Sequence, residues 1–250
     1  MNRILLLTFA ALFLSASLTA KENYSLWWQK ANSYYQQRSY DSAALYYNKI
    51  AELEPSNAEV YYNLGNAYYR LNNIGAAVLS YERALKFNPS HTQAADNLYL
   101  AQSRINNRIP EIPEIFFVRW WNAITKATLA NAYAVIAVLL FLALVGYFIG
   151  HRLKIIPYTA PVQLSVSVII LCTVFLALSI ISAQKMIASD RAIVMQEGSP
   201  LMLQPKYGKS QSQLPEGTKV QICNEKGGWY EVTLPDGRTG WVERSTLVKI

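Results

Sequence analysis

The pattern of hydrophobic and polar positions changes several times along this 250-residue chain. An apolar run at the N-terminus is followed, up to residue 107, by aromatic and small residues that recur at helical spacing. Two uninterrupted apolar runs come next, and beyond residue 188 single hydrophobic residues alternate with polar ones. We therefore predict a membrane protein with a helical region, two membrane-spanning helices and a small all-β domain.

The N-terminal run has the three parts of a secretory signal peptide. Arg3 is followed by an apolar stretch and by small residues that end at Ala20. This order predicts a signal peptide over 1–20, cleaved after Ala20. Leu18, at position −3 relative to that cleavage site, leaves retention as an uncleaved anchor as the alternative. An exported N-terminus places residues 21–126 outside the cytoplasm.

The two long apolar runs, 127–150 and 162–184, are predicted to form a transmembrane hairpin. The first has 24 residues without a charge, which span roughly 36 Å as a helix and exceed the ~30 Å hydrocarbon core. The loop between them, 151–161, contains Arg152 and Lys154 and no acidic residue, as is typical of cytoplasmic loops. We predict a two-pass bacterial inner-membrane protein with both folded domains in the periplasm.

Residues 108–126 are predicted to link the helical region to the membrane. Pro110 and Pro113 favour an extended, stiff spacer. They also form a PxxP sequence, so recognition by an SH3-type domain of the same chain is the alternative. Trp120 and Trp121 are predicted to anchor this segment in the outer membrane interface, where tryptophan is enriched.

The helical region contains a 34-residue repeat, because 24–57 aligns with 58–91. The aligned pairs are Trp27 and Tyr61, Ala31 and Gly65, Tyr34 and Tyr68, Ala43 and Ala77, Tyr47 and Tyr81, and Pro55 and Pro89. Small residues allow two helices to cross closely, and the proline ends the second helix. These positions resemble the tetratricopeptide repeat, with 92–106 as a capping helix. The predicted domain is 21–107.

The resemblance implies a concave groove lined by the first helix of each repeat, where peptide-binding members carry asparagines. Two pairs with a spacing of 31 residues match that pattern, namely Asn32 with Asn63 and Asn66 with Asn97. The lysines of a carboxylate clamp are replaced by Trp28 and Tyr62. The predicted protein-binding groove comprises Trp28, Asn32, Tyr35, Tyr62, Asn63, Asn66, Tyr69, Arg70 and Asn97. Tyr35, Tyr69 and Arg70 suit an aromatic or acidic segment; the alternative is that the set is an ordinary solvated helix face.

Residues 189–250 show the alternation of half-buried strands. The alternating hydrophobic residues are Val220, Ile222, Tyr230, Val232 and Leu234, and Asp236-Gly237 provides a hairpin turn. The motifs EGTKV, GWYEV and DGRTGWV resemble a bacterial SH3 domain, which implies a small β-barrel that binds cell-wall peptides or protein segments. Trp229 and Trp241 are a candidate ligand surface; the alternative is that they are core residues.

Charge and reactive side chains argue against catalysis. Residues 21–107 and 189–250 each carry eight basic and seven acidic residues, whereas 108–188 carries six and two. This basic excess beside apolar runs is typical of anionic lipid contact. His91 and His151 are predicted on opposite sides of the membrane, and Cys172 and Cys223 lie in different segments. We predict no catalytic residues, metal site or cofactor, so the protein is not expected to be an enzyme or a nucleic-acid binder.

The order of these segments resembles the BatE-type proteins of the Bacteroides aerotolerance (Bat) group. The resemblance implies a membrane assembly with von Willebrand A-domain partners and a role in envelope or oxidative-stress tolerance. Two hypotheses follow. The protein is either a scaffold that binds partner proteins in its repeat groove, or a cell-envelope sensor or anchor that binds peptidoglycan or stem peptides through the SH3-like domain.

Overall fold

The computed structural model describes residues 23–113, 115–126, 129–155, 162–187, 190–206 and 209–250. The chain forms two compact units: one contains Asp190–Ile250 together with the helical repeats up to Ile112, and the other is Pro113–Ser189. The predicted signal peptide lies outside the described residues, as does most of the loop between the two apolar runs.

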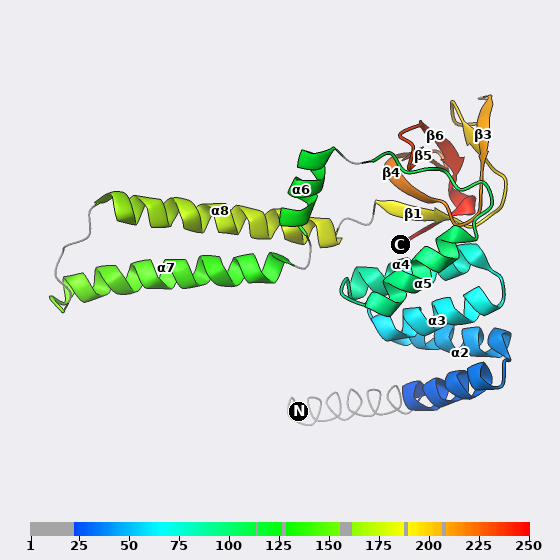
Figure 1. Ribbon diagram of the computed structural model, residues 1–250, viewed down its shortest axis with the longest axis horizontal. Coiled ribbons are helices and arrows are strands. Elements are labelled where there is room, and N and C mark those ends of the chain that lie inside the picture. Colours follow the sequence, from blue (N-terminus) through cyan, green and yellow to red (C-terminus); the bar gives the residue numbers. More distant parts are fainter. Residues whose placement is uncertain (1–22, 114, 127–128, 156–161, 188–189, 207–208) are drawn as a thin grey trace, which may run out of the picture. The chain divides into compact units, whose positions relative to one another are not determined.

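The helical region is a stack of antiparallel helix pairs (Figure 1). Its helices are 23–36, α2 (Tyr40–Leu53), α3 (Ala58–Arg70), α4 (Ile74–Phe87) and α5 (Thr92–Ser103). The side chain of Asn57 accepts hydrogen bonds from the backbone of Glu59 and Val60 and so caps the start of α3. Arg38 and Asn72, one repeat apart, both adopt positive φ (62° and 60°) in the turns within the pairs. The structure thus confirms the tetratricopeptide region.

The aligned small and aromatic residues form the contacts between the paired helices. A Cβ atom on Gly65 would lie 2.6 Å from the ring of Tyr81, so this position admits no side chain without movement of that ring. Ala31, its counterpart in the first repeat, is completely buried. Tyr47 and Tyr81 are both 1% exposed and fill equivalent places in the two repeats.

The C-terminal domain is one antiparallel sheet with the strand order β3-β2-β6-β5-β4-β1-β7. Its strands are β1 (Arg191–Val194), β2 (Ser199–Met202), β3 (Ser210–Leu214), β4 (Lys219–Lys226), β5 (Trp229–Thr233), β6 (Thr239–Glu243) and β7 (Leu247–Lys249). Gly217 and Gly237 both have a φ of +81°, which glycine adopts readily in turns. The strands predicted around Val220, Tyr230 and Trp241 are confirmed.

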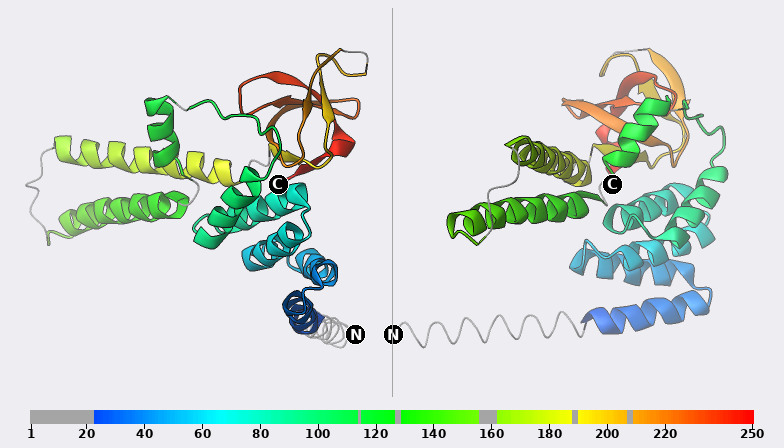
Figure 2. Two further views of the ribbon diagram at one scale, coloured as in Figure 1. Left: turned by 45° about the vertical axis from the view of Figure 1, so that its right-hand side comes forward. Right: turned by 60° about the vertical axis from the view of Figure 1, so that its left-hand side comes forward.

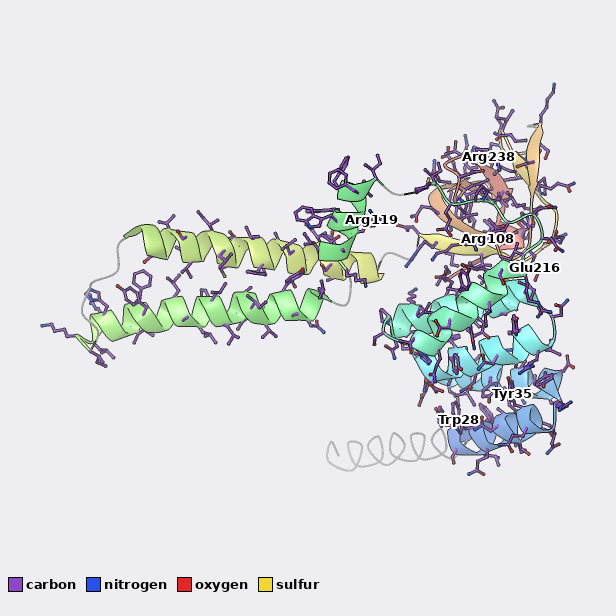
Figure 3. The ribbon with its side chains drawn as sticks, in the orientation of Figure 1. Trp28, Tyr35, Arg108, Arg119, Glu216 and Arg238 are labelled. Carbon is purple, nitrogen blue, oxygen red and sulfur yellow. The ribbon has the colours of Figure 1, made fainter. Side chains whose placement is uncertain are left out.

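The SH3-like domain packs against the second repeat within the same unit (Figure 2). Both carboxylate oxygens of Glu82 on α4 lie 2.8 Å from Nζ of Lys219, and the backbone N–H of Gly75 donates to Glu216 at 2.8 Å (labelled in Figure 3). Beside these polar contacts, Ile193 shares a buried cluster with residues of α4 and α5. The sequence did not predict this contact.

The proline-containing linker forms no helix or strand over 108–113, and its first part is not a free spacer. Ile109 is 8% exposed and belongs to the buried cluster of the SH3-like domain. The backbone N–H of Ile112 donates to the carbonyl oxygen of Pro235 at 3.1 Å. The linker therefore contacts the SH3-like domain of its own chain through two isoleucines, while Pro110 is exposed.

The second unit contains α6 (Phe116–Ile124) and the two long helices α7 (Ala130–Arg152) and α8 (Val162–Ile187). The long helices lie side by side (Figure 1), and Ser179 Oγ on α8 donates to the carbonyl oxygen of Ala130 at 2.9 Å. Both helices are long and apolar enough to cross a membrane. α7 ends two residues beyond the predicted boundary, and α8 three residues beyond it.

Candidate peptide-binding groove

The repeats enclose a hollow of about 350 Å³, called the repeat groove below. Its lining residues come from the first helix and from α3, α4 and α5: Tyr35, Tyr62, Asn66, Tyr69, Arg70, Tyr81, Asn97 and Leu100. Six of them belong to the nine residues predicted for the groove. The remaining three predicted residues, Trp28, Asn32 and Asn63, are not in the lining.

A hydrogen-bonded network fixes the amides at the centre of the groove. Oδ1 of Asn66 accepts hydrogen bonds from the Tyr81 hydroxyl and from Nδ2 of Asn97, both at 2.8 Å. These bonds occupy both lone pairs of the oxygen. The Nδ2 donors of Asn66 and the Oδ1 acceptor of Asn97 form no hydrogen bond with any residue that the structure describes. A neighbouring donor and acceptor match the C=O and N–H groups of an extended peptide backbone.

The first repeat reproduces only part of this network. The Tyr47 hydroxyl donates to Oδ1 of Asn32 at 2.6 Å, in the positions equivalent to Tyr81 and Asn66. Asn63, however, donates to the carbonyl oxygen of Glu59 one turn earlier on its own helix, at 3.0 Å. The spacing of 31 residues thus brings Asn66 and Asn97 into contact, whereas the equivalent amide of Asn63 is bonded locally.

The aromatic residues at the two lysine-matching positions make different contacts. Trp28 stacks on Tyr24 with ring centroids 6.0 Å apart and meets the edge of Tyr47 (Trp28 and Tyr35 are labelled in Figure 3). Its ring packs against the buried cluster of the first repeat. Tyr62 lies 4.7 Å from the ring of His91 and lines the groove. Neither position offers the cation of a carboxylate clamp.

Burial keeps the groove hydroxyls protonated. It raises the pKa of Tyr47 to about 12 and also raises the pKa of Tyr81 above its ordinary value. A hydrogen bond to the Tyr35 hydroxyl raises the pKa of the Arg70 guanidinium. At neutral pH both buried tyrosines therefore remain donors to their asparagines, and Arg70 remains a cation.

Sequence reasoning missed two lining residues and one neighbouring cation. Tyr81 was assigned only a packing role, although its hydroxyl reaches the groove network. Leu100 lines the groove and is 49% exposed. The guanidinium carbon of Arg104 lies 4.8 Å from the ring centre of Tyr69. The 34-residue alignment would have found Arg104, because it is equivalent to Arg70.

The two tryptophans of the SH3-like domain face away from its core. On β5 the half-buried Trp229 alternates with the buried Tyr230, and on β6 the half-buried Trp241 alternates with Val242. Neither tryptophan belongs to the buried cluster of the domain. Their interpretation as core residues is therefore wrong, and their role as a ligand surface stays a prediction.

Helix α6 exposes aromatic side chains along its whole length. Trp120 is 66% exposed and Trp121 47%, and Phe116 is 73% exposed. No residue of this helix is buried, and Arg119 lies among these rings (labelled in Figure 3). These exposures are compatible with the predicted membrane-interface anchor, which stays a prediction.

Within the described ranges, no group of three or more His, Cys, Asp or Glu side chains is placed to hold a metal ion. His91 accepts a hydrogen bond from the backbone of Ala94 at the start of α5. Cys172 and Cys223 are free thiols.

Comparisons with known proteins identify two modules. A model of the tetratricopeptide repeat matches residues 29–92, and a model of the bacterial SH3 domain matches residues 206–248. Both are typically non-catalytic binding modules. A search of curated proteins finds no match.

Three similar solved structures are tetratricopeptide domains. The first domain of Spaghetti (RPAP3), bound to the HSP90 peptide SRMEEVD, is 28% identical over 33% of this chain and 65% of its own, with a TM-score of 0.32. The TPR2B domain of yeast Sti1, in complex with pHsp70, is 18% identical over 32% and 65%, with a TM-score of 0.32. The first domain of human RPAP3 is 29% identical over 32% and 63%, with a TM-score of 0.31. This chain therefore spans just under two thirds of each.

Proposed function

We propose that the protein is a non-enzymatic, membrane-anchored scaffold whose repeat groove holds an extended segment of a partner protein. The observation that carries this proposal is the network of Asn66, Asn97 and Tyr81. It presents a fixed donor beside a fixed acceptor in a concave surface. Six predicted groove residues, chosen for peptide binding, line the same hollow.

The proposed setting is the bacterial inner membrane, with α7 and α8 as a transmembrane hairpin and both folded domains in the periplasm. The predicted signal peptide, the basic residues Arg152 at the end of α7 and Lys154 after it, and the exposed Trp120 and Trp121 support it. The order of the modules supports a Bat-type envelope or oxidative-stress assembly, in which the partners are membrane proteins with von Willebrand A domains.

The test is affinity purification of the full chain from native membranes in mild detergent. We expect membrane-protein partners to co-purify with the wild-type chain and to be lost from an Asn66→Ala/Asn97→Ala variant, which removes the free donor and acceptor. Asn63→Ala is the matched control, because that amide bonds its own helix. An unchanged partner set in the double variant would refute the proposed role of the groove.

A second candidate function is binding of peptidoglycan or stem peptides by the SH3-like domain, as a sensor or anchor. The outward placement of Trp229 and Trp241 favours it. Co-sedimentation of the detergent-solubilised full chain with purified peptidoglycan tests it. We expect the wild-type chain to sediment with peptidoglycan and the Trp241→Ala variant to remain in solution. Equal sedimentation of both would show that the face containing Trp241 does not bind peptidoglycan.

A further inference from the structure

Two arginine–tyrosine pairs, each joining successive repeat units, lie at or beside the groove. Arg70, at the end of α3, lines the groove together with Tyr35 of the preceding repeat, which raises the pKa of its guanidinium. Arg104, directly after α5, lies over the ring of Tyr69 at 4.8 Å. The two arginines are 34 residues apart, as are the two tyrosines. One repeat length therefore relates the two pairs.

Both guanidinium groups are open to an incoming ligand. Arg70 and Arg104 are exposed, and neither forms an ion pair with a carboxylate in the part of the chain that the structure describes. Among the eight described lining residues of the groove, Arg70 is the only charged one. The ring of Tyr69 holds the guanidinium of Arg104 in place, so less freedom of this side chain is lost when an anion binds.

From this arrangement we infer that the repeat groove selects an acidic protein segment, with Arg70 and Arg104 contacting two of its carboxylates. The inference rests on the proposed function, in which the groove asparagines hold the backbone of the segment. Beyond that function, the inference specifies that the bound segment is negatively charged. The arginines lie at the C-terminal ends of neighbouring groove helices, because Asn66 on α3 and Asn97 on α5 are in hydrogen-bond contact.

The packing of these helices sets the spacing of the acidic residues. Packed helices lie roughly 8–10 Å apart, and an extended chain rises about 3.3 Å per residue. Two carboxylates about three residues apart therefore fit the two arginines. A neutral segment forms the same backbone hydrogen bonds but leaves both guanidiniums in water.

The test uses the full chain in detergent and three fluorescent pools of 12-residue peptides. The pools share the same randomised neutral positions and differ at two fixed positions, three residues apart, which are Glu, Gln or Lys. We expect the wild-type chain to retain the Glu pool most strongly. Rising ionic strength weakens this preference, because salt screens exposed charges.

Variants separate the contribution of charge from that of the groove. Arg70→Gln and Arg104→Gln should each weaken retention of the Glu pool roughly two- to five-fold relative to retention of the Gln pool. Arg244→Gln on the SH3-like domain is the control and should change neither. Asn66→Ala should weaken both pools.

The outcomes are distinguishable. Equal retention of the Glu and Gln pools, both weakened by Asn66→Ala, would overturn the acidic ligand and leave the groove function standing. Retention of none of the pools, or retention that Asn66→Ala leaves unchanged, would overturn the groove function as well.

Discussion

The two tetratricopeptide repeats have the same core but different surroundings. Each buries a tyrosine, Tyr47 or Tyr81, whose hydroxyl donates to an asparagine of the same repeat. Only in the second repeat does a further asparagine, Asn97, join the pair. Only the second repeat also forms an ion pair with the SH3-like domain among the described residues. The tyrosine–asparagine contact that both repeats share therefore stabilises the fold. The additional bond from Asn97 contributes to the candidate site.

The largest expected effect comes from removing the buried rings. Tyr47→Ala and Tyr81→Ala each leave a cavity and should lower the free energy of unfolding by about 3–5 kcal/mol. Thermal unfolding of the detergent-solubilised chain, followed by circular dichroism, measures this loss. A much smaller effect at either site would contradict the equivalence of the two repeats.

The two repeats should lose different amounts of stability when a polar contact on their outer faces is removed. Lys219→Met leaves the Glu82 carboxylate, 8% exposed, without its partner, and should cost about 1–3 kcal/mol. Asn48 is equivalent to Glu82 and donates to Tyr68 at 2.8 Å; Asn48→Ala should cost about 1 kcal/mol. Equal effects of both substitutions would show that the Glu82–Lys219 ion pair stabilises the second repeat no more than the Asn48–Tyr68 hydrogen bond stabilises the first.

Removing single hydroxyls should separate stability from binding. Tyr47→Phe and Tyr81→Phe each remove one hydrogen bond to an asparagine and should cost about 1 kcal/mol. Only Tyr81→Phe should also weaken peptide retention, because Asn66 then loses one of the two bonds that orient it. Equal peptide retention by both variants would show that the orientation of Asn66 is unimportant.

A pH dependence is expected only under alkaline conditions. Because burial raises the pKa of Tyr47 from 10.0 to about 12, the unfolded chain loses this proton at a lower pH than the folded chain. The stabilising contribution is complete below about pH 10 and is lost as the pH rises towards 12. Tyr47→Phe should flatten the decline in thermal stability over this range. An identical decline in the wild-type protein and the variant would contradict the raised pKa of Tyr47.

Much of the fold follows from the sequence because its signals are local and periodic. The 34-residue repeat, the long apolar runs and the alternation around Tyr230 each specify an element without distant contacts. β2 and β3 were not predicted individually, since the segments SPLM and SQSQL contain few hydrophobic residues. Their strand structure depends on pairing with each other and with β6.

The candidate site was only partly predictable, because side-chain direction depends on nearby partners. Equal spacing suggested equal roles for Asn63 and Asn97, but Asn63 bonds Glu59 on its own helix. Glu82 and Lys219 are 137 residues apart in sequence, and no local pattern indicates their contact. Such pairings follow from the three-dimensional packing of the two domains.

The most direct test of the central claim, that the repeat groove holds a partner protein, is site-specific photo-crosslinking in intact cells. A photoreactive residue replaces Leu100 in the groove or, as the control, Leu45 on α2, which is 54% exposed and outside the groove. The account predicts crosslinks to a protein partner from position 100, their loss when Asn66→Ala/Asn97→Ala is added, and none of that product from position 45. The same product from both positions, or its persistence in the double variant, would contradict the claim.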